Sequence, residues 1–185
     1  QNRIKREAFY RVGSIYFNQK GYKGTSLDEI ASSLDVTKGA FYYHIKNKEE
    51  LLYQCFIRTL DVEELLLNKA GCVGDRGLEK VELALRYLFN VQLSEEGPLI
   101  RFRSLPSLDE AHRKAVLKSN TKNSDLLGTY IRQGFDDNTL RKIDAGIAQH
   151  VLSGAVEASP DLVDWVSDSN SRELSAAYFH LFING

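Results

Sequence analysis

The residues with the clearest capacity for chemistry lie between positions 37 and 48. This stretch holds three cations and three side chains with polar tips: Lys38, Lys46, Lys48, Tyr42, Tyr43 and His44. Gly39 and Ala40 stand at its front and would let another molecule approach the backbone closely. Cations and hydrogen-bond donors beside such a surface can bind phosphate groups. The ordinary alternative is a solvated, lysine-rich helical corner.

Two short helices are predicted to position these side chains. Ser26 followed by Glu29 matches a capping box, which predicts that a helix begins at Ser26. An apolar stripe then repeats at helical spacing, formed by Leu27, Ile30, Ala31 and Leu34. Asp35 breaks this pattern, and Thr37 is a suitable N-cap for a second short helix. Two helices joined by a tight turn match a helix-turn-helix, whose second helix enters the major groove of DNA.

The segment TSLDEIASSLDVTKGAFYYHIKNKEELL, which begins at Thr25, closely resembles the N-terminal signature of the TetR family of bacterial transcriptional repressors. The resemblance implies a dimer of all-helical subunits. Each subunit would have a three-helix DNA-binding domain in front of a larger helical domain for an inducer and the dimer interface. Two residues depart from the family pattern, Asp35 in place of Gly and Ile45 in place of Phe. Asp tolerates the left-handed backbone conformation, whereas Ile fills less volume beneath the second helix.

Double-stranded operator DNA is therefore the expected partner. Four residues are expected to face the bases or the adjacent backbone: Thr37, Lys38, Gly39 and Tyr42. Five others are expected to contact phosphates: Thr25, Ser26, Tyr43, His44 and Lys48. The main alternative is a helical protein-interaction module that keeps this fold without binding an operator, and the salt dependence of DNA binding would separate the two.

Further helices are predicted on both sides of the motif. A helix over residues 3–20 precedes it, and a helix over residues 47–70, capped by Asn47, follows it and connects two domains. Three glycines within residues 71–77 predict a break. Later helices are expected over residues 78–93, 107–134, 140–158 and 173–183. The second of these would open with a capping box at Ser107.

The predicted fold class is all-α, with a helix-turn-helix DNA-binding domain over residues 1–46 and a ligand-binding and dimerisation domain over residues 47–185. The resemblance implies an unknown small-molecule effector in the second domain, for which the candidate residues are Tyr87, Phe102, Arg103, Tyr130, His150 and Trp165. It also implies a homodimer through the last two helices, with Ile147, Val151, Gly154, Ala155, Ala177 and Leu181 as interface candidates. Packing of these helices within one subunit is the alternative.

Composition places the charge where such a protein needs it. Residues 1–58 carry ten Lys and Arg against six Asp and Glu, a net charge of +4, whereas residues 59–185 carry fourteen against nineteen, a net charge of −5. A basic front on an acidic protein fits a local nucleic-acid footprint. No apolar run reaches the roughly 20 residues of a membrane span. We therefore expect no membrane partner and a location in the bacterial cytoplasm.

Enzymatic chemistry is not expected. Three histidines, His112, His150 and His180, are scattered along the chain without a hydrolase, metalloprotease or phosphate-loop motif. Cys55 and Cys72 lack the spacing of a disulfide framework or a zinc site. We therefore predict no catalytic residue, metal or cofactor, and a small-molecule-binding helical enzyme is the least favoured alternative.

Overall fold

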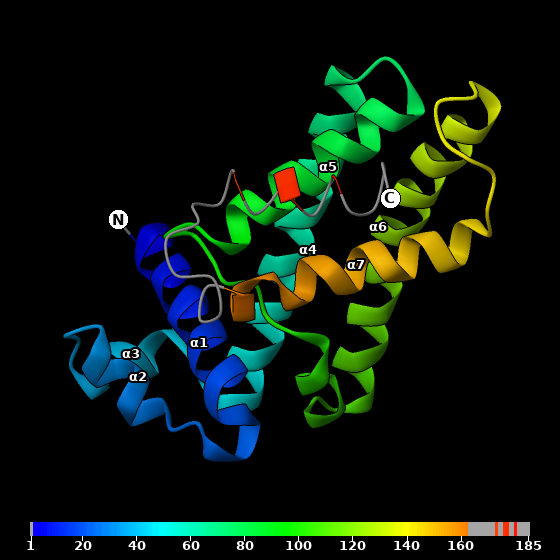
Figure 1. Ribbon diagram of the computed structural model, residues 1–185. Helices are drawn as coiled ribbons and strands as arrows, with labels where there is room; N and C mark the ends of the chain where they lie inside the picture. Colours follow the sequence, from blue (N-terminus) through cyan, green and yellow to red (C-terminus); the bar gives the residue numbers. More distant parts are fainter. Residues whose placement is uncertain (1, 163–172, 174–175, 178–179, 181–185) are drawn as a thin grey trace. The chain divides into compact units, whose positions relative to one another are not determined.

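The computed structural model describes residues 2–162, 173, 176, 177 and 180 (Figure 1). Its elements are α1 (Asn2–Gly24), α2 (Leu27–Ser33), α3 (Lys38–His44), α4 (Lys48–Val73), α5 (Gly77–Gln92), the 3-10 helix η1 (Phe102–Ser107), α6 (Glu110–Asp136) and α7 (Ala145–Leu162). The described part contains no strand, and the predicted all-α class is confirmed. None of its helices is both long and apolar enough to cross a bilayer.

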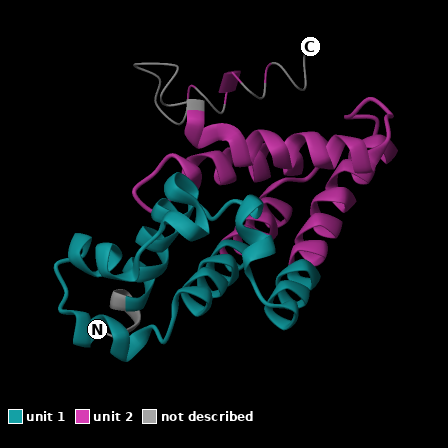
Figure 2. Ribbon diagram, turned by 90° about the horizontal axis from the view of Figure 1, so that it is seen from below, with its two compact units in different colours: residues 1–61, 98–119 teal, residues 62–97, 120–185 magenta. Residues whose placement is uncertain are grey.

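Contacts group the chain into two compact units (Figure 2). Unit 1 comprises residues 1–61 and 98–119, and unit 2 comprises residues 62–97 and 120–185. Both α4 and α6 therefore contribute one end to each unit. The expected boundary between a DNA-binding domain and a ligand-binding domain after residue 46 differs from the boundary between these compact units, and it stays a prediction.

Unit 1 is organised around a core shared by its first four helices. The core side chains include Phe9, Phe17, Leu27, Ile30, Ala31, Phe41, Ile45, Leu51, Leu52, Cys55 and Phe56. The rings of Phe9 and Phe41 lie 4.9 Å apart between centroids, which anchors α3 on α1. Ile45 is 1% exposed, so the smaller side chain still fills the space beneath α3.

The turn between α2 and α3 has the geometry that its sequence predicts. Asp35 adopts φ of 52°, the left-handed conformation that Asp tolerates better than most residues. The N–H groups of Leu34 and Val36 both donate to Ala31 O, at 3.3 and 3.2 Å, and end α2 sharply. Thr37 Oγ1 then accepts from the N–H of Ala40 at 3.2 Å, which confirms the predicted N-cap of α3.

Two predicted capping boxes are wrong. Ser26 is the N-cap of α2, but its hydroxyl makes no cap hydrogen bond, and the Glu29 carboxylate binds Lys20 Nζ at 3.0 Å. Ser107 ends η1 and does not begin α6. The cap of α6 is Asp109, the next helix-breaking acceptor, whose Oδ1 receives the N–H of residue 112 at 2.8 Å.

Residues 98–119 join unit 1 through buried polar side chains of α1 and α4. Asn18 donates to Leu99 O at 2.9 Å and accepts from the N–H of Arg101 at 3.0 Å. Thr59 accepts from the N–H of Ile100 at 3.0 Å. Asn18 and Thr59 are both buried, so each hydrogen bond also removes the cost of an unpaired polar group.

Unit 2 is a helical assembly of the end of α4, α5, the second part of α6, and α7, in which α5 packs against α7. Its core includes Leu67, Val81, Leu85, Leu88, Phe89, Leu127, Tyr130, Ile131, Leu152 and Val156. The hydroxyl of Tyr130 donates to Leu67 O at 3.0 Å, and Gln92 Nε2 donates to Val156 O at 3.4 Å.

The predicted break after residue 70 is shorter than expected, because α4 continues to Val73. Gly71 lies inside the helix, where a Cβ would be 2.1 Å from Tyr130 Oη, so its small size serves packing. Gly77 begins α5, and a Cβ there would lie 2.0 Å from the backbone N of Gly134. The helix expected from residue 140 begins at Ala145. The helix expected over residues 173–183 lies mostly outside the described residues.

Candidate nucleic-acid interface

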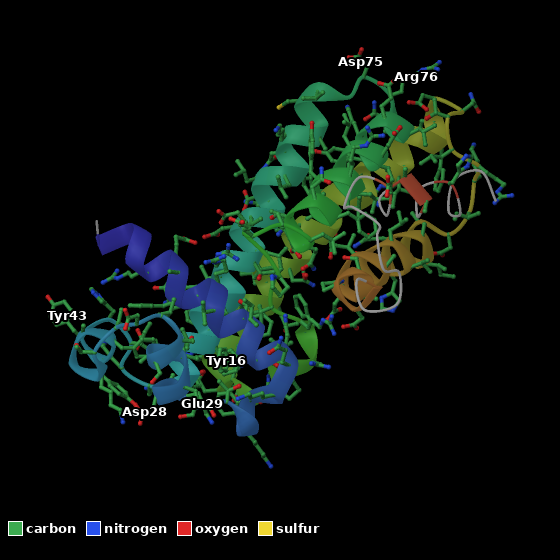
Figure 3. All side chains as sticks on the ribbon, turned by 60° about the vertical axis from the view of Figure 1, so that its left-hand side comes forward. Tyr16, Asp28, Glu29, Tyr43, Asp75 and Arg76 are labelled. Atoms are coloured by element: carbon green, nitrogen blue, oxygen red, sulfur yellow. The ribbon has the colours of Figure 1, made fainter. Side chains whose placement is uncertain are left out.

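The outer face of α3 exposes large aromatic side chains next to a bare backbone. Tyr43 is 82% exposed and Tyr42 is 44% exposed, whereas the neighbouring Phe41 is fully buried. Figure 3 shows Tyr43 projecting away from α3. A Cβ added to Gly39 would meet nothing within 4 Å, so the fold itself does not require a glycine there. Exposed apolar surface of this kind marks an interaction site.

A hydrogen-bonded network joins this face to α2. Lys38 Nζ donates to Asp28 Oδ2 at 2.6 Å, and Tyr42 Oη donates to Asp28 Oδ1 at 3.3 Å. The hydrogen bond from Lys38 lowers the pKa of Asp28, and the same contact raises the pKa of Lys38. Both groups therefore stay charged at neutral pH. Asp28 therefore holds in place Lys38 and Tyr42, two residues expected to face the bases, and its negative charge offsets the positive charge of Lys38.

Asp28 was not among the predicted site residues. On a helical wheel of α2 it is an ordinary solvated acid of the first turn, and only the packing of α2 on α3 brings it to Lys38. It also borders a shallow, open depression of unit 1. The residues lining this depression are Tyr16, Lys20, Asp28, Glu29, Ser32, Ser33 and Lys38.

Lys48, in the first turn of α4, is held in a fixed position near α2. Its Nζ donates to Thr25 O at 3.1 Å and lies 4.6 Å from the ring centroid of Tyr22. The Asn47 side chain accepts from the N–H of Glu50 at 2.8 Å, which confirms the predicted cap of this helix. Ser26 is exposed and its hydroxyl is not used by a cap. Lys48 and Ser26 thus present a cation and a hydroxyl beside the helix-turn-helix.

Two of the residues predicted to contact phosphates, Thr25 and His44, are fully or partly buried. Thr25 is 3% exposed, and its hydroxyl donates to Gly21 O at 2.8 Å. This hydroxyl is occupied in ending α1, and the phosphate contact of Thr25 stays a prediction. His44 is half-buried between Phe9 and Tyr43, with ring centroids 5.9 and 5.0 Å away. Its phosphate contact stays a prediction.

The five candidate effector residues that the structure describes belong to two different compact units. Phe102 and Arg103 lie on η1 in unit 1, where the ring centroids of Phe102 and Phe56 are 5.6 Å apart, and their role in binding an effector stays a prediction. The aromatic ring of Tyr130 belongs to the core of unit 2, and Tyr87 lies beneath Lys69 Nζ at 4.7 Å. His150 is exposed on α7, and Trp165 lies outside the described residues.

Two of the candidate dimer residues, Ile147 and Val151, form an exposed apolar stripe on α7. Ile147 is 65% exposed and Val151 is 44% exposed, and an added Cβ at Gly154 would meet nothing within 4 Å. Ala155 packs partly against the core of unit 2. The stripe borders an apolar hollow of about 190 Å³ that is lined by Val81, Ile131, Phe135, Leu140, Arg141, Ile143, Ile147, Ala148, Val151 and Leu152. Ala177 is exposed, and Leu181 lies outside the described residues.

A helix-turn-helix whose second helix exposes Lys38, Tyr42 and Tyr43 is typical of a DNA-binding transcriptional regulator. Comparison with known proteins identifies the family. Residues 5–55 match the family model described as bacterial regulatory proteins, tetR family. The chain is 30% identical over 148 residues to the transposon Tn10 TetC protein of Escherichia coli, an alignment that covers 76% of this chain and 70% of TetC. The chain belongs to the tetR family of bacterial regulatory proteins and is not an enzyme.

Other similar proteins agree with this assignment. The chain is 51% identical over 119 residues to IcaR of Staphylococcus epidermidis, the negative transcriptional regulator of the biofilm operon icaADBC, and the alignment covers 62% of each protein. The structure also resembles that of AibR in complex with isovaleryl coenzyme A and operator DNA. This similarity has a TM-score of 0.78 at 21% identity, covers 96% and 97% of the two chains, and shows a shared fold.

Proposed function

We propose that this protein is a homodimeric repressor that binds a near-palindromic operator and is released from it by a small-molecule effector. The observation that carries the proposal is the outer face of α3, where Tyr42, Tyr43, Lys38 and a bare Gly39 are all exposed. Residues of these types can approach base edges and phosphates without moving the core. IcaR is a negative transcriptional regulator and AibR binds operator DNA, which supports the same proposal.

Within the interface, the residues fall into two roles. Thr37, Lys38, Gly39 and Tyr42 face the bases or the adjacent backbone, because they form the N-terminal turns of the recognition helix. Ser26, Tyr43, His44 and Lys48 contact phosphates beside it. The open space around Gly39 admits the DNA backbone, because no neighbouring side chain occupies that space.

Dimerisation uses the apolar stripe of α7. Ile147 and Val151 are 65% and 44% exposed and lie four residues apart on α7, so they form one ridge, and Ile143, which is 54% exposed, precedes the helix. A ridge of this kind gains by burial against the same ridge of a second copy, as in a two-fold symmetric interface. Two helix-turn-helix units can then enter successive major grooves about 34–36 Å apart.

The effector is a small molecule bound by unit 2, and the protein works in the bacterial cytoplasm, where operator DNA is found. AibR, which shares the fold, was crystallised with isovaleryl coenzyme A and operator DNA together. An effector must bind the DNA-free state more tightly than the operator-bound state, and a hundredfold loss of operator affinity requires about 2.7 kcal/mol of differential binding. Operator DNA must then weaken effector binding by the same factor.

DNA binding is tested by selecting operator sequences from random duplexes and measuring affinity by fluorescence anisotropy. Tyr43→Ala should weaken binding at least fivefold without loss of stability, because the side chain is almost fully exposed. Leu65→Ala is the matched control, since Leu65 is 67% exposed on α4 in unit 2. If the wild-type protein selects no sequence and its DNA affinity is insensitive to salt, the chain is a helical interaction module and not an operator-binding repressor.

The dimer is tested separately by sedimentation. Ile147→Lys places a charge on the α7 ridge and should shift the protein to monomers. Leu65→Lys, at nearly the same exposure in the same unit, should leave the dimer intact. Dimers that persist in Ile147→Lys would place the interface elsewhere, whereas a wild-type monomer that binds the operator tightly would refute the proposed dimer.

A further inference from the structure

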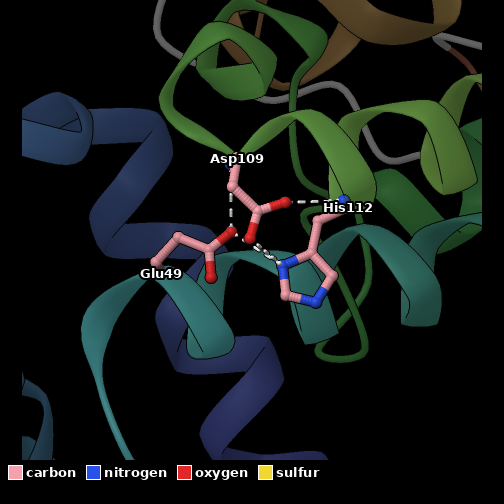
Figure 4. A group of neighbouring side chains, drawn as sticks. All are labelled: Glu49, Asp109 and His112. Carbon is pink, nitrogen blue, oxygen red and sulfur yellow. Dashed lines mark hydrogen bonds and ion pairs between the residues drawn. The ribbon is translucent and has the colours of Figure 1, made fainter.

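A mixed nitrogen and oxygen ligand set lies in unit 1, away from α3. It consists of Glu49 in the first turn of α4, Asp109 at the N-cap of α6, and His112 in the first turn of α6 (Figure 4). His112 Nδ1 lies 2.8 Å from Glu49 Oε1 and 3.3 Å from Asp109 Oδ2. One ligand atom from each of the three side chains lies within 4.8 Å of the other two.

Main-chain hydrogen bonds and an aromatic ring hold the three groups in place. The N–H of Asp109 donates to Glu49 Oε1 at 3.2 Å, and Asp109 Oδ1 accepts from the N–H of His112 at 2.8 Å. The ring of Tyr53, one turn after Glu49, stacks on the imidazole with centroids 3.9 Å apart and an interplanar angle of 20°. The imidazole is therefore fixed with Nδ1 directed at both carboxylates.

We propose that Glu49, Asp109 and His112 form a binding site for a divalent transition metal of the Zn²⁺ type. Zinc binds His nitrogen at about 2.0–2.1 Å and carboxylate oxygen at about 2.0–2.2 Å. Tetrahedral ligands at such distances lie about 3.4 Å apart, and the observed distances of 2.8 and 3.3 Å from His112 Nδ1 to the two carboxylates are each within about 0.6 Å of that value.

The chemistry of the donors selects the kind of ion. An imidazole with two carboxylates suits zinc and its neighbours, whereas magnesium and calcium prefer all-oxygen sites. The side chains of His112, Glu49 and Asp109 are 33%, 24% and 56% exposed, so water can reach the metal and supply the fourth ligand. Binding requires a neutral His112, and any proton on Nδ1 leaves to solvent when the metal takes its place.

The position of the site links it to the DNA interface within unit 1. Glu49 directly follows Lys48, whose Nζ is bonded to Thr25 O beside α2. A bound ion would clamp the first turn of α4 to the first turn of α6 and so restrict the backbone that carries Lys48. This consequence for DNA rests on the proposed function, whereas metal binding does not.

The test uses the full chain, free of affinity tags and treated with chelator, in a Cys72→Ser background, because the exposed Cys72 thiol would also bind soft metals. Calorimetry should show one Zn²⁺ per chain. Co²⁺, used as a spectroscopic probe, should give visible absorption bands of a low-coordinate site. Mg²⁺ should not bind. Circular dichroism checks that each variant remains folded.

Glu49→Gln and His112→Asn should each weaken Zn²⁺ binding at least tenfold and abolish the Co²⁺ bands. The matched controls are Glu110→Gln, an exposed acid one residue from Asp109, and His150→Asn, an exposed histidine of unit 2. Neither control should change metal affinity. Wild-type protein that binds no Zn²⁺, or binding that survives His112→Asn and disappears in His150→Asn, would overturn the proposal. Because the readout is metal binding, its failure leaves the DNA-binding proposal intact, and the reverse also holds.

Discussion

Replacing Lys48 by Ala should weaken DNA binding to every sequence alike and flatten its salt dependence. Lys48 Nζ is held between Thr25 O and the Tyr22 ring, so the cation is already positioned before DNA arrives. Each phosphate contact contributes about 0.9 to the slope of log affinity against log salt. A dimer that loses two such contacts should therefore show a slope smaller by about 1.8.

The same relation gives the loss of affinity. At about 0.15 M salt, one lost contact costs a factor of about 5, and two cost a factor of about 30, whereas at about 0.05 M each costs a factor of about 15. Fluorescence anisotropy at four salt concentrations, with operator and scrambled duplexes, measures both quantities. Lys142→Ala, which removes an exposed lysine from unit 2, is the control for net charge.

The plots of log affinity against log salt for the wild type and Lys48→Ala should converge near 1 M salt, because the substitution removes a contribution from counterion release. Lines that stay parallel at all salt concentrations would refute the phosphate contact. They would mean that Lys48 acts only by fixing the start of α4 through Thr25.

Three further substitutions test the contact between Asp28 and Lys38, the burial of Glu63 and the close packing at Gly77. Asp28→Asn should release Lys38, steepen the salt slope and reduce discrimination between operator and scrambled DNA, measured by the same anisotropy titrations. Glu63→Gln should stabilise the protein at pH 8 but not at pH 4.5, measured by urea unfolding, because burial raises the pKa of Glu63 to about 7. Gly77→Ala should lower the free energy of unfolding by more than about 2 kcal/mol, since its Cβ would lie 2.0 Å from the backbone N of Gly134.

The sign for Glu63 follows from proton binding. Between its ordinary pKa of 4.5 and about 7, the folded state binds more protons than the unfolded state, so stability falls as pH rises through this window. The full shift would correspond to about 3.4 kcal/mol. Glu63 keeps part of its surface accessible, so we expect a gain of about 1–2 kcal/mol at pH 8. Glu95→Gln, an exposed acid, should show no such gain, and equal gains in both variants would contradict the assignment.

The other two variants also have matched controls. For Gly77→Ala the control is Gly39→Ala, where a Cβ meets nothing. Gly39→Ala should keep or slightly raise stability, because Ala is the better helix former, and yet weaken operator binding. If Gly39→Ala binds the operator normally, DNA does not approach this backbone closely. For Asp28→Asn, an unchanged salt slope would show that Lys38 remains neutralised in the complex.

Local sequence was sufficient for the helix-turn-helix. The Thr37 cap, the left-handed Asp35 and the buried face of α2 each depend on residues within one or two turns, and all three predictions are confirmed. The all-α class follows for the same reason, because helical periodicity repeats along the chain. The exposure of Tyr43 was also predictable, since an amphipathic helix that buries Phe41 must turn its other face to solvent.

Contacts between distant residues were decided only by the tertiary structure. The Glu29 carboxylate binds Lys20 and does not cap its own helix, because the end of α1 packs beside α2. Asp28 accepts a hydrogen bond from Lys38, which lies beyond the turn, and Glu49 contacts His112, which lies 63 positions further along the chain. Hydrophobic periodicity determines which face of a helix is buried but does not specify its partner. The polar clusters at helix ends therefore depend on packing between elements, which the one-dimensional pattern does not encode.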